Sequence, residues 1–376
     1  MIIPRFYDNL EEHFSPKRIL LVFGPRRVGK TTLLNGMLDR THLRYKFDTG
    51  ENLSTQHVLG AQETRVLNRY VDDFQLIALD EAQNITNIGM GLKMIIDAHP
   101  DLKMIATGSS SFDLRLRTSE PLTGRKTLIL LFPISQIELR QLYSPYDLRL
   151  QLDERLVLGS YPDVLTASTI DEKITVLKEL ADAYLFKDVL AIEGRKGSKF
   201  ITDLAKMLAL QVGYEVSTNE LATNLGVDAK TIERYLDLLE QTFVIFRLGS
   251  FSRNLRSELR RKQKFYFYDT GVRNAIIGQF NELNSRNDVG ALWENFIVAE
   301  RLKKRSYHNI YGSSYFWRTH SQKEIDLVEE RDGKLFAFEC KWSTRKEVKP
   351  PREWTTNYPE AEFKVITPEN YLEFVT

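Results

Sequence analysis

The segment GPRRVGKT, residues 24–31, places two glycines, a lysine and a threonine at a spacing that suits the binding of a phosphate chain. It matches the pattern GxxxxGK[ST], in which glycines let successive backbone N–H groups turn inward around phosphates. An apolar stretch precedes the segment and the helix-forming stretch TTLLNGMLDR follows it, so a phosphate would also meet the positive end of a helix. The expected nucleotide-binding residues are Gly24, Pro25, Arg26, Arg27, Val28, Gly29, Lys30, Thr31 and Thr32.

A second segment, LIALDEAQ at residues 76–83, supplies the acids that such a site needs. Its apolar residues predict a buried strand that ends at Asp80 and Glu81. We expect Lys30 to reach the β- and γ-phosphates of ATP, while Thr31 and Asp80 hold Mg²⁺. Glu81 would act on the water that attacks the γ-phosphate. The two segments together predict an ATPase with ATP and Mg²⁺ as its ligands.

Two further residues are candidates for catalysis. Ser109 follows the apolar segment LKMIATG and is placed to sense the γ-phosphate or orient the water, although it also fits an ordinary polar loop. Arg125 begins the next strand-like segment and is a candidate charge donor to the nucleotide of a neighbouring subunit. An ordinary surface arginine is the alternative. If Arg125 acts in trans, the protein works as a homo-oligomer.

The C-terminal region carries a second group of acids. Asp326 lies in one strand-like segment, and Glu339-Cys340-Lys341 lies in the next, joined by the strong turn signal Asp332-Gly333. Alternate residues of a strand share one face of its sheet, so these side chains would gather around Mg²⁺ or Mn²⁺ as in a nuclease. Glu294 on the preceding helix would complete the set. An inactive relic of such a site and an unrelated ion-paired sheet are the alternatives.

A basic stretch, FSRNLRSELRRKQKF at residues 251–265, is the best candidate for contacting nucleic acid. Lys230 and Arg234, on the second of two short helices expected within 217–240, would join Arg253 in that footprint. Acids on the same helix would oppose DNA, and a protein partner is the alternative.

The elements that must position these residues follow from hydrophobic periodicity. Strands are expected at 18–24, 43–49, 74–81, 102–109 and 126–132, alternating with helices, and the less apolar 43–49 is expected at an edge. Helical periodicity dominates 136–205. The segment FVIFRLGSF is expected as a hairpin after the two short helices, and strands return near the C-terminus. We divide the chain into 1–140, a P-loop core; 141–205, a helical lid; 206–255, a winged helix; and 256–376, a mixed α/β domain.

Composition limits the class of protein. The 376 residues carry 52 basic and 51 acidic side chains, so no overall charge attracts nucleic acid or membrane. A single cysteine, Cys340, excludes an internal disulfide and fits a cytoplasmic protein. Neither a secretion signal nor a membrane span is expected, because the N-terminus is mixed in charge and apolar runs are short.

The chain resembles a large family of prokaryotic AAA-type ATPases with a C-terminal domain of unknown function. The resemblance rests on GPRRVGKTTLL, LDEAQ, TGSSS with LTGR, LGSYPDV, KFYFYDTGV, ALWENFIVAE, and EIDLV paired with FECKW. It implies an ATPase core, a helical lid, a winged helix-turn-helix and a restriction-endonuclease-like C-terminal fold. Cys340 departs from the β-branched residue usual in that family and is expected to point into the core.

Three functions fit these observations. The preferred one is an ATPase that acts on DNA or a DNA-bound partner. The second is a metal-dependent nuclease gated by ATP, and the third is a nucleotide-switched module that binds a partner protein.

Overall fold

The computed structural model describes residues 3–108, 122–182, 198–252, 263–319, 321–343 and 347–376. The chain forms two compact units, each with its own β-sheet. Residues 4–132 and 241–243 make up the N-terminal unit, and the C-terminal unit contains 133–240 and 244–376. The division into four parts proposed from the sequence stays a prediction.

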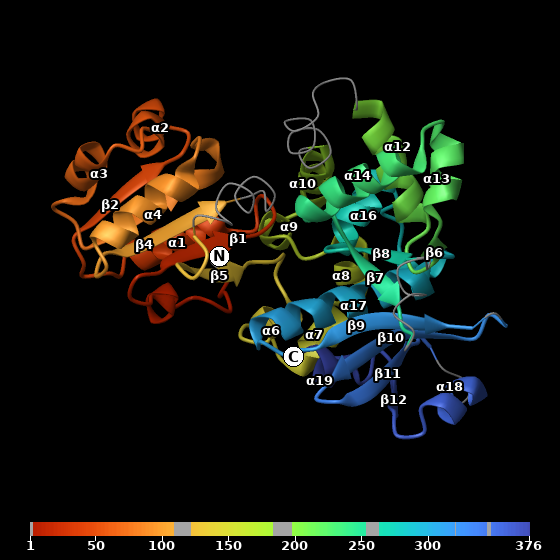
Figure 1. Cartoon of the computed structure of the whole chain (residues 1–376). Helices are drawn as coiled ribbons and strands as arrows, with labels where there is room; N and C mark the ends of the chain where they lie inside the picture. The colour runs from red at the N-terminus through yellow and green to blue at the C-terminus, as the bar shows by residue number, and fades with distance from the viewer. Residues whose placement is uncertain (1–2, 109–121, 183–197, 253–262, 320, 344–346) are drawn as a thin grey trace. The chain divides into compact units, whose positions relative to one another are not determined.

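The N-terminal unit is built on a five-stranded, fully parallel sheet in the order β2-β3-β4-β1-β5 (Figure 1). All five expected strands are present, as β1 (Ile19–Phe23), β2 (Tyr45–Thr49), β3 (Leu76–Asp80), β4 (Lys103–Gly108) and β5 (Lys126–Leu130). The less apolar segment forms the edge strand β2, as expected, and the central strands β1 and β3 are buried throughout. Parallel strands buried on both faces require continuous apolar sequence, which explains why these were recognisable.

Helices flank this sheet, and those on one face pack with it in a common hydrophobic core. Leu59, Leu67 and Leu92, from three different helices, pack in one core with Leu21 and Leu79 of the sheet. The helical elements are η1 (Leu10–His13), α1 (Lys30–Leu38), α2 (Leu53–Gly60), α3 (Thr64–Val71), η2 (Ala82–Asn84) and α4 (Ile88–Ala98).

The C-terminal unit begins with a run of helices, as the periodicity of 136–205 predicts. These are α6 (Gln136–Leu139), α7 (Pro145–Leu150), α8 (Leu152–Leu158), α9 (Pro162–Thr166), α10 (Ile170–Asp182) and α12 (Ser198–Leu210). The two expected short helices follow as α13 (Thr218–Leu225) and α14 (Ala229–Gln241). Ser217 accepts a hydrogen bond from the Glu220 N–H, and Gly226 ends α13 in the left-handed conformation, as the capping signals indicate.

A seven-stranded mixed sheet in the order β12-β11-β10-β9-β7-β8-β6 forms the rest of the C-terminal unit. The segment FVIFRLGSF was expected to form a whole hairpin, but it contributes the single strand β7, which pairs with β8. A winged-helix fold therefore stays a prediction. The strands are β6 (Glu215–Val216), β7 (Ile245–Ser250), β8 (Gln263–Phe267), β9 (Ser313–Arg318), β10 (Glu324–Arg331), β11 (Lys334–Cys340) and β12 (Glu362–Ile366). The remaining helical elements are α16 (Thr270–Ile277), η5 (Leu283–Ser285), α17 (Val289–Tyr307), α18 (Arg352–Asn357) and α19 (Tyr371–Val375).

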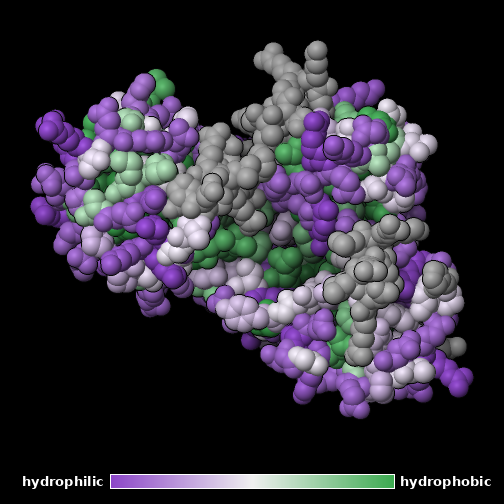
Figure 2. All heavy atoms as spheres, in the orientation of Figure 1, coloured by the Kyte–Doolittle hydropathy of each residue, from purple (hydrophilic) through white to green (hydrophobic). Residues whose placement is uncertain are grey.

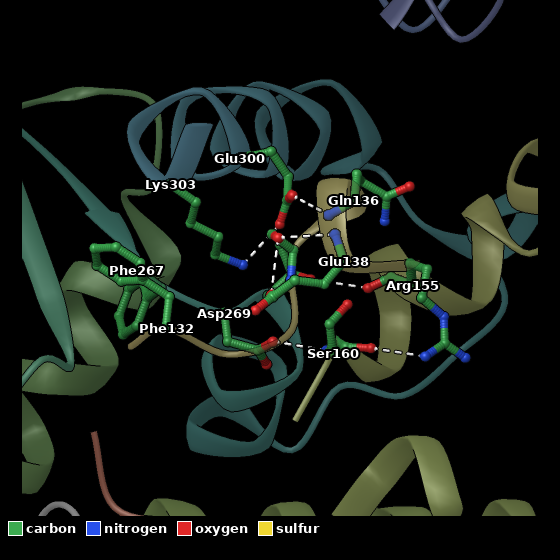
Figure 3. A network of polar contacts seen from close by, with 12 residues as sticks. Phe132, Gln136, Glu138, Arg155, Ser160, Phe267, Asp269, Glu300 and Lys303 are labelled. Atoms are coloured by element: carbon green, nitrogen blue, oxygen red, sulfur yellow. Dashed lines mark hydrogen bonds and ion pairs between the residues drawn. The ribbon is translucent and has the colours of Figure 1, made fainter. Parts of the chain in front are cut away.

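Three of the motifs behind the family resemblance meet in a buried polar network (Figure 3). The Ser160 N–H donates to Asp269 Oδ2 at 2.7 Å, and a Cβ at the preceding Gly159 would lie 2.0 Å from Asp269 Oδ1. Glu300 accepts from the backbone N–H of Gln136 and from Lys303 Nζ, both at 2.7 Å. The glycine and the acids of these motifs thus have a structural role, because buried polar groups require partners.

The visible surface of both units is largely hydrophilic (Figure 2), in keeping with the high content of charged residues. Among the helices of the described residues, none has the length and apolar character needed to cross a bilayer.

Candidate functional site

The predicted phosphate-binding loop connects the end of β1 to the start of α1. Gly29 has φ +90° and immediately precedes the first helical residue, Lys30. The side chain of Lys30 is buried, and its Nζ donates to the carbonyl oxygens of Gly24 at 3.0 Å and Pro25 at 2.6 Å. The loop thus folds around the ammonium group. Both of these carbonyl partners are neutral.

Arg5, which was not predicted from the sequence, holds the loop through hydrogen bonds to backbone carbonyl oxygens. Arg5 is buried and donates to the carbonyl oxygens of Val28 at 3.0 Å and Phe132 at 2.7 Å. Gly24, the first residue of the loop, is also tightly packed, because a Cβ there would lie 2.0 Å from the Leu131 carbonyl oxygen. Arg5 stands far from the motif in the sequence and has no local pattern that would identify it.

Three neighbouring strands bring the metal-binding candidates together. β4 lies between β1 and β3, so its carboxyl end reaches both the loop and the acids. Thr31 Oγ1 donates to Asp80 Oδ2 at 2.7 Å, and Thr107 Oγ1 donates to Asp80 Oδ1. The hydroxyl of Thr107, which is completely buried, also accepts from the Glu81 N–H at 3.1 Å. Thr107 was missed by the sequence analysis, although a polar residue at the end of a buried strand was a usable signal.

Glu81 is held in an uncommon conformation. Its φ is +48°, in the left-handed region, where a residue other than glycine costs about 1–3 kcal/mol. Gln83 Nε2 donates a hydrogen bond to Glu81 Oε2. Gly50 packs against the Glu81 carbonyl oxygen so tightly that a Cβ there would approach to 2.3 Å. These contacts fix the orientation of the Glu81 carboxylate, which follows Asp80 in the sequence.

The other two catalytic candidates do not join this arrangement in the described part of the chain. Ser109 lies outside the described residues. The carbonyl oxygen of Arg125 accepts from the Ile19 N–H, which places Arg125 at the amino end of β1, whereas the loop follows its carboxyl end. The guanidinium pairs with Asp97 at 2.6 Å on the surface. Arg125 is therefore separated by the length of a strand from the loop of its own chain.

The C-terminal acids are brought close together, as the sequence analysis expected. Asp332 and Gly333 form the tight turn between β10 and β11, both with positive φ. The resulting register pairs Leu327 with Phe338, and one step further places Asp326 across from Glu339. Lys341 Nζ pairs with Glu339 at 2.7 Å. Cys340 is buried, as expected.

The pKa values of Glu294 and Asp326 are both raised, because each acid is buried near another acid. Burial and the charge of Asp326 raise the pKa of Glu294 to about 7, while Lys264 and Tyr266 oppose that rise. Burial and the charge of Glu339 raise the pKa of Asp326 to about 6. Within the described ranges, no three His, Cys, Asp or Glu side chains are grouped so that they could hold a metal ion. Metal binding by Asp326 and Glu339 remains a prediction.

Lys264 also belongs to this cluster, although it lies in the basic stretch 251–265 that was expected to contact nucleic acid. It lies on β8 with a completely buried side chain, and its Nζ is 2.8 Å from Glu294 Oε1. It also pairs with Glu324, while the Tyr266 hydroxyl donates to Glu294 at 2.6 Å. The available signal was a lysine and a tyrosine at alternate positions of an otherwise apolar strand, because such positions share a face.

The DNA-binding candidates are only partly described. Lys230 and Arg234 are exposed on α14, and Arg253 lies outside the described residues. Three acids of α14 converge on Arg247. Counted together, α14 and Arg247 carry as many basic as acidic side chains. The distances from the Arg247 guanidinium are 3.7 Å to Glu233, 2.5 Å to Asp237 and 2.5 Å to Glu240. The described face of α14 therefore has no excess of positive charge.

Comparisons with known proteins agree with this geometry in the N-terminal unit. Residues 16–140 match the family model described as "AAA domain", and two models described as "Domain of unknown function", DUF8612 and DUF4143, match 149–283 and 289–372. The AAA match and the geometry of the loop together support an AAA-type P-loop ATPase domain.

Similar proteins cover most of the chain. An uncharacterized protein of Mycobacterium tuberculosis is 29% identical over 88% of this chain and 71% of its own length. An uncharacterized protein of Haemophilus influenzae is 25% identical over 87% of this chain and 84% of its own length.

Similar solved structures include the RuvB Holliday junction branch migration motor of Thermotoga maritima, with 17% identity and a TM-score of 0.28 over 61% of this chain and 82% of RuvB. Domain III of the replication initiation protein DnaA from Thermotoga maritima has 16% identity and a TM-score of 0.28, over 46% of this chain and 90% of that domain. These scores are too low to establish a common arrangement of whole chains.

Proposed function

We propose that the chain binds ATP at residues 24–32 and hydrolyses it in a Mg²⁺-dependent reaction. The observation that carries this proposal is the connection of Thr31, Asp80 and Thr107 through hydrogen bonds. It joins the phosphate-binding loop, the acidic strand and the strand between them in one site. An ordinary glycine turn would not require a threonine hydroxyl to meet an aspartate at the end of a buried strand.

The donor atoms at this point fit Mg²⁺. The Thr31 hydroxyl and the Asp80 carboxylate lie 2.7 Å apart and are oxygen ligands of the kind that Mg²⁺ prefers. Thr31 and Asp80 would hold the ion, with phosphate oxygens and water completing its shell. When bound, Mg²⁺ would neutralise charge on the phosphates.

The chain's own residues divide the remaining work. Lys30 leaves its carbonyl partners to bind phosphate oxygens and stabilises the negative charge that moves during transfer. Glu81 orients a water and accepts its proton. Gln83 and Thr107 hold Glu81 by its carboxylate and its backbone N–H, so the acid is in place before the water arrives.

We also propose that Arg125 serves the nucleotide of another copy of the chain. Arg125 is separated from its own loop by a strand of five residues, or about 16 Å, so it has no role in its own site. Its side chain is 37% exposed, and its guanidinium pairs with Asp97 at the surface, so another copy can reach it. Mixing Lys30→Ala with Arg125→Ala should then restore part of the activity that each lacks alone, and Asp97→Asn should remain active. No restoration in the mixture would contradict this arrangement.

The ATPase proposal is tested by initial rates of ATP hydrolysis at increasing Mg²⁺, with the parent and Asp80→Asn. The parent should show Mg²⁺-dependent turnover that Asp80→Asn loses, while Asp97→Asn, the same change on the surface, should retain it. Equal Mg²⁺ dependence in the parent and Asp80→Asn would contradict the site. Adding DNA tests whether the ATPase acts on DNA. An unchanged rate of ATP hydrolysis at low salt would favour a protein partner.

A further inference from the structure

Lys264 is a charged residue in a place where charge is rarely tolerated. Its side chain is completely buried, and its partners Glu294 and Glu324 come from α17 and β10, remote in the sequence. A lysine is buried in this way only when carboxylates pair with it. The ammonium group therefore joins three separate elements of the C-terminal unit.

The surrounding carboxylates have donors of their own. Glu294 accepts from the Tyr266 hydroxyl at 2.6 Å as well as from Lys264, and Asp326 Oδ2 accepts from the Cys340 N–H at 2.7 Å. Glu339 pairs with Lys341 at 2.7 Å. Each acid that was predicted from the sequence to bind a metal ion thus already contacts a lysine, a hydroxyl group or a backbone N–H.

Two lysines offset part of the negative charge of this cluster without a metal ion. Four acids, Glu294, Glu324, Asp326 and Glu339, face the two lysines Lys264 and Lys341, so the lysines offset half of the acidic charge.

We propose that the Lys264 ammonium group is the built-in cation of this cluster and takes the charge-neutralising role that a divalent metal ion has in a nuclease. The carboxylate cluster then stabilises the C-terminal unit and does not cleave nucleic acid. Lys341 is held by Glu339 and is not available to activate water. The inference is independent of the proposed ATPase and concerns a different part of the chain.

The proposal predicts that removing the ammonium charge opens the cluster to a metal ion. Mn²⁺ binding would be measured by electron paramagnetic resonance on the full chain without nucleotide. An Asp80→Asn background excludes the ATP site. The parent background should bind no Mn²⁺ at the cluster, while Lys264→Gln should gain one Mn²⁺ with at least tenfold higher affinity. Adding Glu339→Gln to Lys264→Gln should abolish that site, and Lys264→Arg, which retains the charge, should resemble the parent.

Two further measurements test the proposal even if Lys264→Gln does not fold. The melting temperature of the parent background should be unchanged by Mn²⁺ or by a chelator. The parent should also fail to cleave DNA or RNA with Mn²⁺. Stoichiometric Mn²⁺ binding that Glu339→Gln abolishes, or cleavage that Lys341→Ala abolishes, would overturn the proposal. So would a folded Lys264→Gln that binds no more Mn²⁺ than the parent.

Discussion

Both units of this chain bring a buried lysine close to acids, but the two lysines differ in what they contact. Lys30 donates to two backbone carbonyl oxygens, and the nearby Asp80 accepts from two hydroxyl groups. Lys264 instead pairs directly with the carboxylates of Glu294 and Glu324. These two partners of Lys30 are neutral, whereas both partners of Lys264 carry the opposite charge.

This difference explains why the same residue types serve opposite purposes. A neutral partner stabilises a charged side chain without cancelling its charge, so the charge can still act on a phosphate or a metal ion. An opposite charge in the protein interior satisfies the side chain completely, and losing one partner then destabilises the fold. Substitutions at the two lysines should therefore affect different properties.

The largest expected effect is on catalysis in the N-terminal unit. Glu81→Gln should lower the turnover of ATP by about 10²–10³-fold, because the acid that accepts the proton from water is lost. Affinity for ATP should stay within about threefold of the parent, since the role proposed for Glu81 is to act on water and not on phosphate. Rapid-quench measurement of turnover together with equilibrium binding of ATP checks both parts. Unchanged turnover would remove Glu81 from the mechanism.

In the C-terminal unit the largest effect should be on stability. Lys264→Ala should lower the free energy of unfolding by about 3–5 kcal/mol, because it leaves buried carboxylates without their partner. Lys341→Ala should cost about 1 kcal/mol or less, since the Lys341 side chain is 40% exposed. Urea unfolding followed by circular dichroism compares the two variants. Equal losses would show that burial of Lys264 has no special role.

The acids of the cluster predict a dependence of stability on pH. The pKa of Glu294 rises from 4.5 in the unfolded chain to about 7 in the folded protein, so the folded state binds its proton more tightly. The stability that this residue contributes is therefore full below about pH 4.5 and is lost as the pH rises to about 7. Replacing Glu294 with Gln should remove on the order of 2 kcal/mol of that decline, measured by urea unfolding across this range. An unchanged profile would contradict the raised pKa.

A smaller effect is expected at Thr107, which holds both acids of the ATP site. Thr107→Val keeps the shape of the side chain but removes its hydroxyl, so we expect kcat to fall about tenfold. Thr107→Ser keeps the hydroxyl and should retain most of the activity. The dependence of the rate on Mg²⁺ should shift to higher concentration in the valine variant only. Equal rates for the two variants would mean that the hydroxyl does not position the acids.

The two regions also differ in how far they could be predicted. The loop at 24–31 and the acids at 80–81 were recognisable because each follows an apolar strand, and the structure brings Thr31 and Asp80 together. Arg5 and Thr107 were missed because their contacts depend on strand order, which the local sequence does not encode. The hairpin around Asp332 was expected for the same local reason, and it forms.

Lys264 shows where local patterns fail. Its partners Glu294 and Glu324 are brought to it only when β8, α17 and β10 pack together. A lysine within the strand QKFYF looks like an exposed residue of a strand with one face in contact with solvent. Its charge changes the interpretation of the whole acidic cluster, and only the tertiary structure provides that information.

The proposal that Lys30 binds a phosphate of ATP is tested most directly by equilibrium binding. Isothermal titration with Mg²⁺ present would compare the parent with Lys30→Ala and with Lys17→Ala, the same substitution at an exposed position of the N-terminal unit. We predict that the parent and Lys17→Ala bind ATP equally well and that Lys30→Ala binds at least about tenfold more weakly. Equal affinity in all three proteins, or no binding by the parent, would contradict the account.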